Sequence, residues 1–121
     1  MVLALVDDLM FRSKIKSTAT PLGVAVTFAG SSAAALTAMR AALPSLVIFD
    51  LNNPRTDPLG TIAAMKKDAA LASIPTIGYV SHADVATIDA ARAAGVGDVL
   101  ARSAFAIQLP ELLSAATTKP R

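Results

Sequence analysis

The chain alternates short apolar runs with helix-like segments, and this alternation constrains its fold more than any other feature. The apolar runs have the length of buried strands, and they cover residues 2–6, 24–28, 46–49, 74–80 and, more weakly, 98–101. The segments between and after them predict helices at about residues 10–18, 33–43, 58–67, 84–94 and 110–116. Five strand–helix units in this order predict a parallel sheet that is covered by helices on both faces.

Turn-forming and capping residues separate these units. The serine at position 31 or 32 suits a helix N-cap, Asp57-Pro58 suits a cap followed by proline at the first helical position, and Gly95 suits a helix end. Five units predict a flavodoxin-like α/β fold with strand order 2-1-3-4-5, because a TIM barrel needs eight units. We expect one domain at residues 1–116 and a C-terminal tail at 117–121.

Composition and charge exclude several classes of protein. The chain has no cysteine, so disulfides, thiolate metal sites and a cysteine nucleophile are excluded. A net charge of +2 gives no reason to expect a nucleic-acid partner. We also expect no signal peptide and no membrane span, because Asp7-Asp8 interrupt the first apolar run and Arg40 and Pro44 interrupt the longest one. The expected location is the cytoplasm.

Polar side chains follow the predicted strands where each strand ends. Asp7 and Asp8 come after the first strand, Asp50 ends the third, Ser81 ends the fourth and Arg102 ends the fifth. In the order 2-1-3-4-5 the topological switch point lies between the first and third strands, where ligands of such sheets bind. The sequence therefore predicts a shared site at this edge of the sheet.

Three carboxylates in one crevice repel one another, and a divalent cation would relieve that repulsion. Two like charges ~4 Å apart cost about 4 kcal/mol at an effective dielectric constant near 20. Mg²⁺ prefers oxygen ligands and commonly takes one or two carboxylates together with water and phosphate oxygens. A carboxylate held there can attack phosphorus, while Ser81 and Arg102 hold the phosphoryl oxygens.

This constellation resembles the receiver domain of bacterial response regulators, and the resemblance covers essentially the whole chain. The matching motifs are the acidic pair in Val6-Asp7-Asp8, the segment 48–54 around Asp50, Ser81 at the end of a strand, and the glycine turn at 94–98. The resemblance implies the CheY-like fold and a signalling domain of two-component phosphorelays rather than an enzyme.

The resemblance also implies a role for each site residue. Asp8, Asp50 and the backbone carbonyl of Asn52 would ligate Mg²⁺, and Asp7 would act through water. Asp50 would accept a phosphoryl group from a histidine kinase or a histidine phosphotransfer protein. Ser81 would bond to that group, and a stand-alone domain would then signal through contacts with a downstream protein.

The sequence departs from the receiver pattern after its fifth strand. Arg102 stands where the family has lysine, Ser103 stands where it has proline, and Val99 replaces the aromatic residue that many members carry. Arginine keeps the charge but is larger and planar. Without the proline, the cis peptide bond of the family is not expected, and the loop at 102–105 is expected to be displaced.

These departures leave a second interpretation of the same fold. The chain is then a degenerate receiver, a protein-binding module whose state does not depend on phosphorylation. A flavin site is disfavoured, because acids rather than hydroxyls and glycines follow the first strand. A dehalogenase-type phosphatase is disfavoured because Asn52 stands where its second acid is needed. The alanines near the last helix suit docking or formation of a homodimer. His82 is expected to face solvent.

Overall fold

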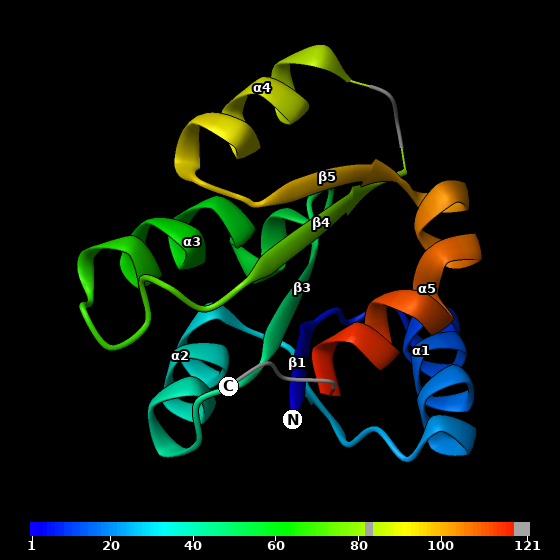
Figure 1. Ribbon diagram of the computed structural model, residues 1–121. Helices are drawn as coiled ribbons and strands as arrows, with labels where there is room; N and C mark the ends of the chain where they lie inside the picture. Colours follow the sequence, from blue (N-terminus) through cyan, green and yellow to red (C-terminus); the bar gives the residue numbers. More distant parts are fainter. Residues whose placement is uncertain (82–83, 118–121) are drawn as a thin grey trace.

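The structure is a computed structural model, and it describes residues 1–81 and 84–117. A five-stranded parallel sheet forms its centre, with the order β2-β1-β3-β4-β5 (Figure 1). The strands are β1 (Val2–Leu5), β2 (Val26–Ala29), β3 (Leu46–Asp50), β4 (Thr76–Val80) and β5 (Asp98–Ala101). The predicted flavodoxin-like fold and its strand order are confirmed.

Helices cover both faces of this sheet. They are α1 (Leu9–Leu22), α2 (Ser32–Ala41), α3 (Pro58–Lys67), α4 (Val85–Ala94) and α5 (Arg102–Thr117), with the 3₁₀ helix η1 (Pro54–Thr56) between β3 and α3. In Figure 1, α1 and α5 lie side by side against one face, and α2, α3 and α4 cover the other. The carboxyl ends of β1 and β3 lie side by side, because these two strands pair in parallel.

The central strands are buried on both faces, which explains their continuous apolar sequence. In β1, Leu3 and Leu5 belong to the core shared with α2, α3 and α4, whereas Val2 and Ala4 belong to the core shared with α1 and α5. All four side chains are inaccessible to solvent. The polar residues that follow β1 and β3 therefore emerge from a rigid, fully packed layer.

The predicted caps lie where the sequence indicated. The Ser31 side chain accepts from the backbone N–H of Ala34 at the start of α2, and Asp57 caps α3 ahead of Pro58. Gly95 ends α4 in the left-handed conformation, with φ of 108°. These short-range signals are local hydrogen bonds and backbone preferences, so the sequence reveals them directly.

The last helix differs from the sequence prediction. We expected it to begin near Pro110, with Arg102 ending the fifth strand and a loop at 102–105, but α5 begins at Arg102 itself. The apolar residues Phe105, Leu109 and Leu113, spaced by four, are fully buried against the sheet. Pro110 lies on the exposed side of α5, and burial of that stripe outweighs the cost of a proline inside the helix.

Other boundaries shift by a few residues. α1 runs on to Leu22 with Pro21 in its last turn, and α2 ends at Ala41 rather than near Leu43. β2 and β4 each begin two residues later than the apolar runs suggested. His82 lies outside the described residues. Within residues 1–81 and 84–117, no helix has both the length and the apolar character needed to cross a membrane.

Candidate phosphoryl-acceptor site

Five of the six predicted site residues line one cleft of about 400 Å³ at the carboxyl edge of the sheet. Asp7 and Asp8 follow β1, Asp50 ends β3, and the strand order sets β1 beside β3. The full lining is Asp7, Asp8, Asp50, Asn52, Asn53, Pro54, Arg55 and Ser81. Adjacent parallel strands thus deliver their carboxylates to one place, as their positions in the sequence predicted.

Asp50 is the most deeply placed of the three acids, with 9% of its surface exposed. Burial raises the pKa of its carboxyl group above the ordinary value of 3.8, because a charged carboxylate loses solvation there. The backbone N–H of Asn52 donates to Asp50 Oδ1 at 3.1 Å and opposes that rise. The negative charges of Asp8 and Asp7 raise the pKa further, and the positive charge of Arg102 lowers it by a smaller amount.

Asp8 has a structural task as well as a place in the cleft. Its Oδ1 accepts from the backbone N–H groups of Met10 at 2.9 Å and Phe11 at 3.2 Å, which caps α1. Its Oδ2 is 4.0 Å from Arg102 Nη1. One oxygen of Asp8 is thus committed to the helix, and the other remains directed to cations.

Asp7 is held by the loop that follows β3. Asn53 Nδ2 donates to Asp7 Oδ1, and Arg55 Nη2 donates to Asp7 Oδ2 at 2.8 Å. Neither partner was predicted from the sequence. The available signal was weak: a basic residue five positions after Asp50, in a loop that the fold brings to the same edge of the sheet.

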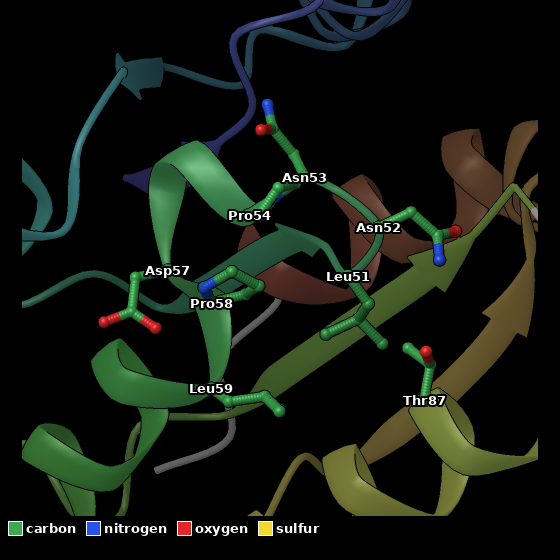
Figure 2. A pocket seen from close by; sticks show the side chains of 8 residues that line it. All are labelled: Leu51, Asn52, Asn53, Pro54, Asp57, Pro58, Leu59 and Thr87. Carbon is green, nitrogen blue, oxygen red and sulfur yellow. The ribbon is translucent and has the colours of Figure 1, made fainter.

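Asn52 links the ends of β3 and β4. The backbone N–H of Ser81 donates to Asn52 Oδ1, so the amide side chain points toward the end of β4 (Figure 2). This bond sets Ser81 on the rim of the cleft. Ser81 does not cap α4, because the Asp84 side chain does so by accepting from the N–H of Ala86 at 3.0 Å.

Arg102 lies at the edge of the site rather than in the lining of the cleft. Its guanidinium carbon is 5.6 Å from the centre of the Phe11 ring, a distance at which a cation–π contact forms. Phe11 in turn packs against Tyr79 and Phe105, with ring centres 4.7 Å and 5.8 Å away. Arg102 therefore rests on an aromatic cluster formed by α1, β4 and α5.

Tyr79 is the buried polar group beneath this site. It is 1% exposed, and its hydroxyl is the one buried side-chain polar atom without a hydrogen-bond partner among the described residues. Burial raises the pKa of Tyr79, and the charge of Asp50 adds to that rise.

The oxygen ligands of the cleft suit a hard divalent cation that takes only some of its ligands from side chains. In the part of the chain that the structure describes, no three His, Cys, Asp or Glu side chains converge on a common metal position. Mg²⁺ needs only one or two carboxylates, because water and carbonyl oxygens complete its octahedron. Asp8 and Asp50 with the carbonyl of Asn52 suit such a set, and a cation there would relieve the repulsion of Asp50 by Asp8 and Asp7.

A second hollow of about 400 Å³ adjoins the acidic cleft and shares Asn52, Asn53 and Pro54 with it. Figure 2 shows Leu51 and Leu59 pointing toward Thr87 of α4, while the Asn53 side chain points away from them. The loop after β3 therefore borders both hollows.

No protein-family model matches the sequence, and no curated protein matches it. Solved structures do match. A response regulator from Hahella chejuensis aligns with a TM-score of 0.85 and 20% identity, over 97% of this chain and 94% of that chain. The Mn²⁺-bound form of response regulator Rcp1 aligns with a TM-score of 0.82 and 16% identity, over 98% and 96%.

A third match is the phosphorylated cyanobacterial phytochrome response regulator RcpA, with a TM-score of 0.79 and 20% identity over 94% of this chain and 88% of that chain. All three share the arrangement of this chain along nearly its full length. The chain therefore has the flavodoxin-like, CheY-like fold in which these response regulators are built.

Proposed function

We propose that this chain is a receiver domain of two-component signalling, which accepts a phosphoryl group on Asp50. The observation that carries the proposal is the cleft itself, in which Asp50 lies at its base with Asp7, Asp8 and Ser81 around it. The fold shared with a phosphorylated and with a Mn²⁺-bound response regulator supports this assignment. The donors are a histidine kinase or a histidine phosphotransfer protein.

The chemistry requires a carboxylate nucleophile and compensation of negative charge. An Asp50 oxygen attacks the phosphorus atom of the donor, an acyl–phosphate bond forms, and the bond from phosphorus to the donor's leaving group breaks. Mg²⁺, when bound by Asp8, Asp50 and the Asn52 carbonyl, supplies positive charge at the phosphoryl oxygens. Asp7 is expected to act on that ion through water.

Arg102 and Ser81 complete the site in this proposal. The guanidinium of Arg102 is already oriented by Phe11 and Asp8, and it is 48% exposed, so it can turn toward a phosphoryl oxygen. The Ser81 side chain sits on the rim of the cleft and can donate its hydroxyl proton to another oxygen. Movement of Ser81 toward the phosphoryl group would pull the start of the β4–α4 loop and so pass the signal to a partner protein.

A second candidate function is a receiver fold that binds partners without phosphorylation. The observation that favours it is the set of internal cations: Arg55 lies 2.8 Å from Asp7, and Arg102 lies 4.0 Å from Asp8. These guanidinium groups offset part of the acidic charge that a metal ion would otherwise neutralise.

Intact-mass measurement separates the two candidates. The protein is incubated with MgCl₂ and acetyl phosphate, with the Asp50→Asn variant beside it. The receiver proposal predicts one added phosphoryl group on the wild type and none on the variant. No adduct under conditions that label an ordinary receiver would favour the phosphate-independent module.

A further inference from the structure

The Arg55 side chain occupies the outer end of the acidic cleft. It lines the cleft, and its Nη2 donates to Asp7 Oδ2 at 2.8 Å while Asn53 holds Oδ1. The side chain of Asp7 is only 20% exposed, whereas that of Arg55 is 78% exposed. The Asp7 carboxylate is therefore held in place and largely buried, whereas the Arg55 guanidinium that neutralises it is exposed and can move into solvent.

The backbone of Arg55 is fixed, which sets where its guanidinium can reach. Asn53 caps η1 by accepting from the Arg55 backbone N–H at 3.0 Å, and Pro54 fills the first position of the turn. Thr56 is fully buried, and its hydroxyl donates to the carbonyl of Asn53 at 3.1 Å. The turn therefore keeps Arg55 beside Asp7 without depending on their ion pair.

We propose that Arg55 is an internal competitor of the divalent cation, and that its ion pair with Asp7 sets the metal affinity of the site. The inference rests on the proposed function, because it assumes that a divalent cation binds this cleft. A metal ion in the cleft would interact with the Asp7 carboxylate, directly or through a water ligand. The Arg55 guanidinium is bound to the same carboxylate. Binding of one cation therefore weakens binding of the other, and the effect is reciprocal.

The size of the competition follows from the exposure of the pair. Ion pairs with a solvent-exposed partner contribute little, which corresponds to a change of about two- to fivefold in a competing equilibrium. Arg55→Gln removes the charge and keeps a polar side chain, although a shorter one. We expect this variant to bind Mg²⁺ about two- to fivefold more tightly than the wild type.

Calorimetric titration with MgCl₂ tests the inference without any phosphoryl transfer. Lys14→Gln is the matched control, since Lys14 is an exposed cation of α1 that takes no part in lining the cleft. It should leave Mg²⁺ affinity unchanged. In an Asp7→Asn background, Arg55→Gln should have no further effect, because the competing pair is already absent.

The outcomes distinguish this inference from the proposed function. Equal Mg²⁺ affinity of the wild type and Arg55→Gln would overturn the inference and leave the metal site standing. The same gain in Mg²⁺ affinity from Arg55→Gln in the Asp7→Asn background would also overturn it. The Arg55 charge would then act on the metal ion at long range and not through its ion pair with Asp7. If neither protein binds Mg²⁺, the metal part of the proposed function fails together with the inference.

Discussion

Asp50 combines burial with negative neighbours, and both effects work against its charged form. Its pKa is raised above 3.8, so the folded protein holds the Asp50 proton more tightly than the unfolded chain does. This contribution to stability is fully present below the unfolded pKa and is lost as the pH rises through the folded pKa. At neutral pH, without a metal ion, Asp50 therefore lowers the free energy of unfolding.

Replacing Asp50 with asparagine should stabilise the metal-free protein at neutral pH. The amide removes the charge but can still accept the N–H of Asn52 through its oxygen. We expect a gain of ~0.5–2 kcal/mol in the free energy of unfolding at pH 7. Urea unfolding at several pH values measures it, and the gain should shrink toward zero as the pH falls below the ordinary Asp value. A gain that is independent of pH would contradict this electrostatic explanation.

Arg102 lies over the ring of Phe11 and 4.0 Å from Asp8. Arg102→Ala should slow labelling by acetyl phosphate by about tenfold, below the 10²–10³ range for a fully preorganised oxyanion donor, because the side chain is half exposed. Arg102→Lys should recover part of the rate, since it keeps the charge but not the planar stacking on Phe11. Equal rates for the wild type and the alanine variant would show that Arg102 only pairs with Asp8.

The sequence could predict which side chains lie together wherever the fold alone decides their position. Asp7, Asp8, Asp50 and Ser81 follow strand ends, so strand order brings them to one edge. Arg55 could not be found this way, because its contact with Asp7 depends on the conformation of η1. The side-chain conformations in this loop decide which groups contact Asp7, and they leave no periodic pattern in the sequence.

At the scale of elements, α5 is where sequence patterning and structure diverge. The pattern suggested a helix starting at Pro110, because proline is favoured in a first helical turn. The structure places Pro110 in the interior of a helix that begins eight residues earlier. Its buried stripe continues through that position, so tertiary packing overrides the local preference of one residue.

Pro110→Ala tests which assignment holds. Inside a helix, proline is about 3 kcal/mol less favourable than alanine, and Pro110 is exposed, so no packing is lost. We expect the variant to gain ~1–3 kcal/mol in the free energy of unfolding, measured by urea denaturation. Little change, or a loss of stability, would indicate that a separate helix starts at Pro110 as the sequence pattern suggested.

β2 and β4 were both predicted to begin two residues too early. Ala25 and Pro75 stand just before these strands, and their carbonyls accept from the backbone N–H groups of Val2 and Val47, but both residues are exposed. The paired ladders begin only at Val26 and Thr76. Hydrophobicity reports burial, whereas a strand is defined by its ladder of hydrogen bonds. The number, type and order of the elements were nevertheless predictable, because the alternation of the whole chain fixes them.

At the scale of the whole molecule, metal binding should be coupled to stability. An ion that binds the folded state alone stabilises it by RT ln(1 + [L]/Kd), or about 1.4 kcal/mol at ten times the dissociation constant. For a domain of this size that corresponds to a rise of ~4–8 °C in Tm.

Thermal unfolding with increasing MgCl₂ measures this coupling. The Tm of the wild type should rise with the logarithm of the Mg²⁺ concentration, and a chelator should reverse the rise. Asp50→Asn should gain much less, because it lacks the central carboxylate. An equal rise for the wild type and Asp50→Asn would mean that Mg²⁺ stabilises the chain at another place.

If Asp50 is the phosphoryl acceptor, the modified residue can be located chemically. The protein is treated with acetyl phosphate and MgCl₂, the acyl phosphate is reduced with borohydride, and the digested peptides are mapped by mass spectrometry. We expect reduction to homoserine at position 50 and at no other acid. Modification at Asp7 or Asp8 with position 50 unchanged, or no reducible acyl phosphate at all, would contradict it.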